Sequence, residues 1–175
     1  EKAYYCGLSK GGMVGQKLAT RNPERLHAAV FCATSSYMGP ANLWQQRIDA
    51  AHAGGMESVS DGTLERWFTP SYHSTHSSEI AKIREMIHAT PVDGFAGCCI
   101  AIKDMDQRET IKTIDLPVLV IAGAEDPGTT PAMNKLIADS IPGAEYVELP
   151  ESAHFCNVQA SDGFNTALAD FLLKH

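Results

Sequence analysis

The feature that most constrains the fold is a strand, a helix and a second strand close together at the start of the chain. Residues 2–6 are rich in aromatic side chains, residues 13–20 have a helical pattern, and residues 26–33 form an unbroken apolar run of strand length. Apolar strands separated by a helix are typical of a parallel sheet that is covered on both faces. This stretch therefore predicts an α/β protein.

The strand pattern returns near the other end of the chain. Residues 116–123 are an apolar strand, and further segments follow as helix, strand and helix, at 132–140, 144–149 and 157–173. The sequence between the two strand regions has only helical periodicity, at 42–53, 63–68, 79–90 and 93–102. We therefore expect a core segment at 1–37, a helical cap at 38–105 and a second core segment at 106–175.

The charge and hydropathy of the chain argue against nucleic acids and membranes as binding partners. The net charge is −7 and the basic residues are scattered, so no surface for nucleic acid is indicated. No apolar stretch reaches the roughly 20 residues that cross a bilayer, and neither end resembles a signal peptide. We expect a cytoplasmic protein that binds neither nucleic acid nor membranes.

The cysteines and histidines suggest no metal or other cofactor. The five cysteines lie mostly in apolar runs without zinc-type spacing, which favours reduced, structural thiols. His73 and His76 are close in sequence, but no carboxylate or cysteine accompanies them at ligand spacing. The expectation is a chain without a cofactor.

The stretch Gly7-Leu8-Ser9-Lys10-Gly11 has the pattern G-x-S-x-G. It follows an expected strand and precedes an expected helix, the context in which a sharp turn exposes a nucleophilic serine. A glycine-rich turn without catalytic function is the alternative interpretation. Ser9 is therefore a candidate nucleophile that needs a base and an orienting acid to support it.

Two later loops supply an acid and a base. Asp126 follows the strand at 116–123, and His154 follows the strand at 144–149. The order Ser, Asp, His is that of α/β-hydrolases. For Asp126 the alternative is a cap on the helix near Pro131, and for His154 it is a cap or a surface residue.

The residues around these three positions resemble bacterial 3-oxoadipate enol-lactonases of the α/β-hydrolase superfamily. The segment CGLSKGGMVGQKLA at 6–19 resembles their nucleophile segment. Two other groups of segments resemble their cap and their acid and base loops: LERWFTP at 64–70 and GFAGCCIAIKDMD at 94–106, then VIAGAEDP at 120–127 and Ala153-His154. The resemblance implies a partial α/β-hydrolase fold with a helical cap insertion.

The resemblance also implies a reaction and the roles of residues in it. A serine hydrolase without a cofactor would open 3-oxoadipate enol-lactone to 3-oxoadipate, in the β-ketoadipate pathway of aromatic catabolism. Ser9 would attack, His154 would act as base, Asp126 would orient His154, and the backbone N–H of Lys10 would bind the oxyanion. A carboxylesterase or perhydrolase with the same residues, a hydrolase of carbon–carbon bonds, and an inactive or ligand-binding fragment are the alternatives.

Two further expectations concern the residues that bind the substrate and the part of the fold that would precede residue 1. The lactone carries a carboxylate, for which Arg47 and Arg66 in the cap are candidate ligands, with Trp44 and Trp67 as candidate walls of the pocket. Members of the family carry a further half-domain before the nucleophile strand, with the second oxyanion donor. That half would come from the same protein or from another chain, and without it the strand at 2–6 would have an unpaired edge.

Overall fold

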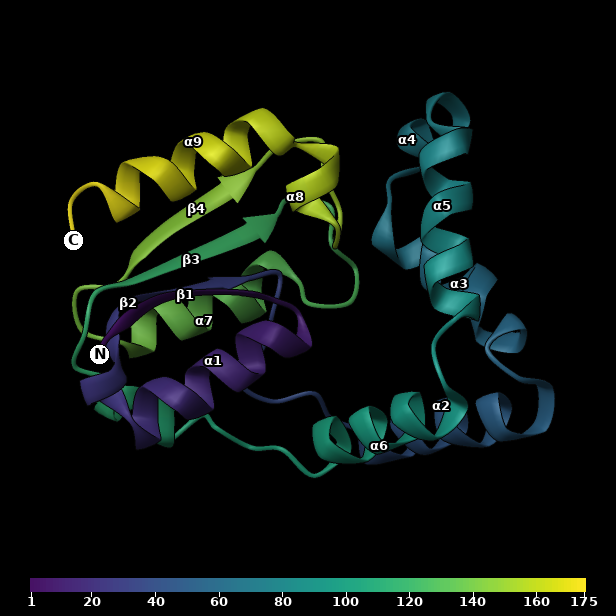
Figure 1. The fold of residues 1–175 in the computed structure, drawn as a ribbon, viewed down its shortest axis with the longest axis horizontal. Helices are drawn as coiled ribbons and strands as arrows, with labels where there is room; N and C mark the ends of the chain where they lie inside the picture. The colour runs from purple at the N-terminus through teal and green to yellow at the C-terminus, as the bar shows by residue number, and fades with distance from the viewer. The chain divides into compact units, whose positions relative to one another are not determined.

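Four parallel strands form one sheet in the computed structural model, which describes residues 1–175. Their order in space is their order in sequence (Figure 1): β1 (Ala3–Leu8), β2 (Leu26–Cys32), β3 (Val118–Gly123) and β4 (Glu145–Leu149). Because every neighbouring pair is parallel, the carboxyl ends of all four strands lie at the same edge of the sheet.

The two central strands are buried on both faces. Every residue of β3 and all but one of β2 are buried, and successive side chains alternate between two apolar clusters. Ala29, Phe31 and Val120 belong to one cluster, and Val30 and Ile121 belong to the other. This burial explains the continuous apolar runs, since a strand covered on both faces has no solvent side.

Helices cover both faces of the sheet. Two helices, α1 (Lys10–Arg21) and α7 (Pro131–Ser140), contribute to the cluster that contains Phe31. Two others, α8 (Cys156–Gln159) and α9 (Ser161–Leu172), contribute to the cluster that contains Val30. Short 3-10 turns at Pro23–Arg25 and Thr110–Thr113 precede β2 and β3. The α/β fold class predicted from the sequence is thus confirmed.

The chain divides into two compact units. The sheet unit comprises Glu1–Ser36 and Asp106–His175, and the helical unit comprises Tyr37–Met105. The helical unit enters the sequence between β2 and β3, and its elements are α2 (Ala41–Gly54), α3 (Glu57–Trp67), α4 (Pro70–Thr75), α5 (Ser77–His88) and α6 (Val92–Lys103). At the two ends of the inserted segment, the N–H of Gln107 donates to the carbonyl of Ser36 at 2.8 Å.

The helical unit has its own small core between α2 and α6. Ile48 on α2 packs with Ala96 and Cys99 on α6, and Trp44 and Phe95 lie against them. None of the helices in the structure is long and apolar enough to cross a membrane.

Three details differ from the sequence-based expectation. The expected terminal helix at 157–173 is interrupted at Ala160, whose φ of −120° and ψ of 47° are not helical. The helix expected at 63–68 begins earlier, at Glu57. The short helix α4 was not expected, although Thr69 caps it and Pro70 is its first residue, a common helix start.

Candidate active site

Three loops at the carboxyl edge of the sheet carry the candidate residues. Ser9 follows β1 directly, Asp126 lies in the loop after β3, and His154 lies in the loop after β4. The carboxyl edge of an open parallel sheet is where ligands of α/β proteins commonly bind. The sheet topology alone therefore gathers residues that are far apart in the sequence.

Ser9 has an unusual backbone conformation. Its φ of 54° and ψ of −115° lie in a region that a residue with a side chain rarely occupies, at a cost of about 1–3 kcal/mol. Two hydrogen bonds hold it there: its N–H donates to Cys32 O at 2.8 Å, and Thr34 Oγ1 donates to its carbonyl at 2.7 Å. The strand β2 and the loop after it thus fix the turn that presents Ser9.

The hydroxyl of Ser9 is not used to cap a helix. Ser9 occupies the N-cap position of α1, where serine usually accepts a backbone N–H, but it makes no such bond. Lys10 is the first residue of α1, at the positive end of the helix dipole. Backbone N–H groups at this end of a helix are suited to bind a negatively charged oxygen.

The two glycines of the G-x-S-x-G pattern differ in their surroundings. A Cβ built on Gly7 would lie 2.4 Å from the carbonyl carbon of Gly11, whereas a Cβ on Gly11 would meet no atom within 4 Å. Tyr5 supports the same turn by donating its hydroxyl hydrogen to the Gly11 carbonyl at 2.6 Å. Close backbone approach thus requires glycine at position 7 but not at position 11.

The Asp126 carboxylate is buried and accepts four hydrogen bonds. Oδ1 accepts the N–H groups of Gly128 at 2.8 Å and Thr129 at 3.0 Å. Oδ2 lies 2.7 Å from both the Thr129 hydroxyl and His154 Nδ1. Asp126 thus forms a direct, buried contact with the imidazole of His154. It does not cap α7, because the N-cap of that helix is Thr130.

These contacts select one tautomer of His154. The Asp126 carboxylate only accepts, and the Thr129 hydroxyl already donates its hydrogen to Asp126 Oδ2. Both oxygens next to His154 Nδ1 are therefore acceptors, including Thr129 Oγ1 at 3.2 Å. The proton of a neutral ring is held on Nδ1, and Nε2 carries the lone pair that a general base requires.

The loops that carry Asp126 and His154 pack directly against each other. The N–H of Glu125 donates to Ser152 O at 2.9 Å, and a Cβ on Gly123 would lie 2.1 Å from Ala153 O. Glycine at the end of β3 therefore allows the two loops to approach closely enough for the Asp126–His154 contact.

The cap candidates Trp44, Arg47, Arg66 and Trp67 all lie half-buried in the helical unit. The Arg47 guanidinium lies over the Trp44 ring at 4.7 Å from its centre, and Trp44 donates its indole N–H to Met38 O. Burial lowers the pKa of Arg47, and burial followed by the charge of Arg47 lowers the pKa of Arg66. The charge of Glu65 acts in the opposite direction on Arg66, but neither arginine forms an ion pair with a carboxylate.

Sequence reasoning missed two buried polar residues near Asp126. Thr129 lies three residues after Asp126, a spacing at which a hydroxyl can bond back to a carboxylate. Asn134 shares the buried face of α7 with Ile137 and Ala138. A polar residue at an apolar position of an amphipathic helix is the signal that could have identified it.

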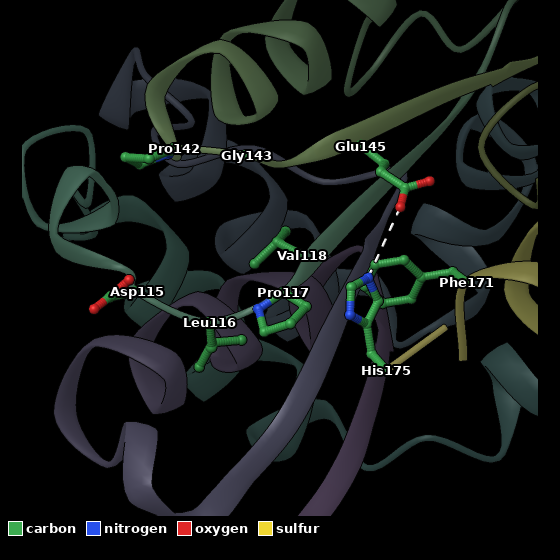
Figure 2. A pocket seen from close by; sticks show the side chains of 9 residues that line it. All are labelled: Asp115, Leu116, Pro117, Val118, Pro142, Gly143, Glu145, Phe171 and His175. Carbon is green, nitrogen blue, oxygen red and sulfur yellow. Dashed lines mark ion pairs between the residues drawn. The ribbon is translucent and has the colours of Figure 1, made fainter. Parts of the chain in front are cut away.

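The other features of the molecule indicate no second site of similar chemistry. No group of three or more His, Cys, Asp or Glu side chains is arranged to hold a metal ion. A cavity of about 370 Å³ lies at the amino ends of β3 and β4, with Asp115, Pro117 and Phe171 among its lining (Figure 2). Glu145 in this cavity lies 3.1 Å from Lys174 Nζ and 3.9 Å from His175 Nε2. The cavity lies at the opposite ends of the strands from the loops that carry Ser9, Asp126 and His154.

Comparison with known proteins finds relatives that match nearly the whole of this chain. The curated 3-oxoadipate enol-lactonase 2 of Acinetobacter baylyi is 34% identical over 95% of this chain and 62% of that protein. A solved hydrolase from Pseudomonas aeruginosa matches with a TM-score of 0.94 and 39% identity, over 98% of this chain and 64% of the other. No family model matches.

The solved enol-lactonase from Burkholderia xenovorans matches with a TM-score of 0.96 and 37% identity, over 98% of this chain and 66% of the other. The chain thus spans less than two thirds of the length of each of these relatives. The chain therefore has part of an α/β-hydrolase fold and is similar to 3-oxoadipate enol-lactonases over nearly all of its residues.

Proposed function

We propose that the full-length protein hydrolyses a lactone or another carboxylic ester, and that 3-oxoadipate enol-lactone is its substrate. The observation that carries the proposal is the buried 2.7 Å contact between Asp126 Oδ2 and His154 Nδ1, at the sheet edge where Ser9 lies. The named activity of the Acinetobacter and Burkholderia relatives supports the substrate. The reaction would serve the β-ketoadipate pathway of aromatic catabolism.

In the first half of the proposed reaction, Ser9 Oγ attacks the lactone carbonyl carbon and its proton moves to His154 Nε2. Asp126 stabilises the resulting imidazolium without accepting the proton. The ring C–O bond of the lactone then breaks, and the departing enol oxygen takes the proton from His154. The product of this half is an acyl group on Ser9.

In the second half, water attacks the acyl carbon while His154 takes a proton from it. The tetrahedral intermediate collapses, Ser9 recovers its proton from His154, and 3-oxoadipate leaves after the enol becomes a ketone. The backbone N–H of Lys10 would donate to the oxyanion in both halves. Loss of one such donor typically lowers the rate roughly 100- to 1,000-fold.

Recognition of the substrate carboxylate is proposed for the helical unit. The paired cations Arg47 and Arg66 supply charge in an acidic protein, and their lowered pKa values reflect the cost of keeping them partly buried together. An anion near both would relieve that repulsion. Trp44 and Trp67 would form apolar walls beside it.

The proposal includes the part of the fold that the relatives have and this sequence does not contain. A preceding segment, in the same protein or in a separate chain, would pair with the outer edge of β1 and supply the second oxyanion donor. None of the five cysteines forms a disulfide, which supports the proposed location in the reducing cytoplasm.

The test is turnover of the enol-lactone by the full-length protein, followed as the loss of its ultraviolet absorbance. We expect the wild type to open the lactone and Ser9→Ala to lower kcat by roughly 10⁶-fold, as when a nucleophile is removed from such a set of residues. Arg47→Ala with Arg66→Ala should raise KM more than it lowers kcat, because both residues act in binding.

The control is a simple aryl ester that carries no carboxylate, which the double arginine variant should hydrolyse as the wild type does. Hydrolysis of the aryl ester without turnover of the lactone would replace the proposed substrate by that of a general carboxylesterase. Failure of the wild type on both substrates would contradict the enzyme assignment.

A further inference from the structure

A buried chain of hydrogen bonds connects the turn at Ser9 with the loop at Asp126. Thr34 Oγ1 donates to the carbonyl of Ser9 at 2.7 Å, and the N–H of Thr34 donates to Asn134 Oδ1 at 3.0 Å. Asn134 Nδ2 donates to the carbonyl of Thr129 at 2.8 Å. Thr129 Oγ1 then donates to Asp126 Oδ2, so three side chains connect the two loops.

The connecting residues are excluded from water. Thr34 and Asn134 are fully buried, and Thr129 is 2% exposed. A buried hydrogen-bond network without water has a low local dielectric constant, which strengthens its bonds and makes the loss of any one of them costly. These contacts therefore hold the loops more firmly than exposed contacts of the same length would.

Asn134 fits this position in only one orientation. Its acceptor Oδ1 receives the Thr34 N–H, and its donor Nδ2 faces the carbonyls of Thr129 and Thr130, at 2.8 and 3.1 Å. A carboxylate of the same shape would oppose both carbonyls, because it has no hydrogen to donate. The site thus selects an amide, and the amide fixes the distance between the loop after β2 and the loop after β3.

Thr129 acts on the carboxylate itself. Its hydroxyl and its N–H bind different oxygens of Asp126, so the plane of the carboxylate is fixed relative to His154. Because its hydrogen is used on Asp126, its oxygen can only accept from His154 Nδ1 at 3.2 Å. Valine has the same shape as threonine but no hydroxyl, so it can neither donate to Asp126 Oδ2 nor accept from His154 Nδ1.

We propose that Thr129 and Asn134 are positioning residues, which hold the Asp126–His154 pair in the orientation that activates Ser9. This inference rests on the proposed function. It adds two residues that act through Asp126 and through the loops, without touching the substrate.

The experiment uses full-length protein and the variants Thr129→Val, Thr129→Ser and Asn134→Asp. The rate of covalent reaction of Ser9 with a fluorophosphonate measures activation of the nucleophile without reference to the natural substrate. The proton resonance of His154 Nδ1 reports the contact with Asp126 directly. Thr130→Val is the matched control, since the side chain of Thr130 caps α7 through Met133 N, and the change leaves the carbonyl that accepts from Asn134 in place.

We expect Thr129→Val to slow the reaction of Ser9 by roughly 10- to 100-fold, the effect of losing a hydrogen bond to a charged group. Thr129→Ser should restore most of the rate, and Asn134→Asp should be at least as slow as Thr129→Val. Thr130→Val should lower the unfolding temperature but react at the wild-type rate. The Nδ1 resonance should shift or broaden in Thr129→Val alone among the threonine variants.

A Thr129→Val variant that reacts at the wild-type rate, with an unchanged Nδ1 resonance, would overturn the inference while leaving the proposed function intact. Failure of the wild type to react would contradict the proposed function, and the Nδ1 resonance would then decide the positioning role by itself. If Asn134→Asp does not fold, the comparison between valine and serine at position 129 still gives the result.

Discussion

At the scale of single residues, the candidate site depends on backbone atoms that approach one another unusually closely. Ser9 has a strained φ and ψ, and the backbone of Gly7 lies so close to that of Gly11 that a side chain on Gly7 would not fit. Such strain persists only where neighbouring contacts fix the conformation, here Cys32, Thr34 and Tyr5.

The glycine contacts give a matched pair of substitutions. Gly7→Ala should cost about 1–3 kcal/mol of unfolding free energy, because the new methyl group meets backbone atoms that cannot move aside. It should also slow the reaction of Ser9 with a fluorophosphonate. Gly11→Ala, on the open side of α1, should stabilise the protein by about 0.4–1 kcal/mol. Urea unfolding measures both, and equal effects of the two changes would contradict the role given to Gly7.

Because the thiol of Cys156 is buried, we expect the unfolding free energy of the protein to fall at alkaline pH. Burial, and then the charge of Asp126, raise its pKa from 9.0 to about 12. Above pH 9 the unfolded chain loses this proton while the folded protein keeps it. The stabilising contribution of the protonated thiol is therefore complete below pH 9 and is lost progressively as the pH rises to about 12. Each pH unit in this window costs about 1.4 kcal/mol.

We therefore expect the unfolding free energy of the wild type to fall more steeply between pH 9 and 12 than that of Cys156→Ala. Cys98→Ala, which removes a half-buried thiol in the helical unit, is the control. Parallel curves for the wild type and Cys156→Ala would show that this thiol does not titrate as described.

At the scale of elements, α7 joins the core to the candidate site. Its buried face carries Ile137 and Ala138, which pack against β2 and β3, and one turn earlier it carries Asn134. The same helix therefore has a stabilising part and a positioning part. Changes in the first should alter unfolding without specifically altering the reaction of Ser9.

Two neighbouring residues of α7 test this division. Ile137→Ala removes a side chain that is 0% exposed and should cost about 2–5 kcal/mol. Leu136→Ala changes a side chain that is 46% exposed and should change stability by no more than about 0.5 kcal/mol. Urea unfolding of the two variants gives the comparison, and a similar loss in both would contradict the burial assigned to Ile137.

The strands could be predicted from the sequence because β2 and β3 are buried on both faces and therefore read as apolar runs. The loops after β1, β3 and β4 follow from that prediction, and so do the places of Ser9, Asp126 and His154 in them. The break of the last helix at Ala160 could not be predicted, since alanine favours helix and only tertiary contacts override it.

The hydrogen bonds of Thr129 and Asn134 also escaped prediction, for a different reason. Asn134 bonds to Thr34 across 100 residues of sequence. Local patterns contain no information about such a pairing, and a threonine after a strand is unremarkable by itself. Contacts of this kind become visible only when the order of the strands is known.

At the scale of the whole molecule, β1 is the strand with the most exposed surface. It pairs with β2 alone, and Tyr4 is 48% exposed on it. Cys6 is exposed on the same strand, and its contact with Cys32 Sγ at 3.9 Å lowers the pKa of the Cys6 thiol. A thiol with both properties reacts readily with disulfide reagents.

Cys6 can therefore report whether a preceding segment covers β1. We expect Cys6 to react rapidly with a chromogenic disulfide in a chain of residues 1–175 and much more slowly in the full-length protein. Cys6→Ser removes the rapid phase and is the control. Equal rates in the two forms would mean that no preceding segment covers this strand.

The inserted helical segment begins and ends at neighbouring positions of the sheet unit, Ser36 and Gln107. The inserted helices leave and re-enter the sheet unit at two positions joined by one hydrogen bond, so the sheet does not depend on the length of what lies between them. Doubling such an insertion costs only about 0.6 kcal/mol in loop-closure entropy. The helical segment can therefore be exchanged as a module without altering the pairing of the four strands.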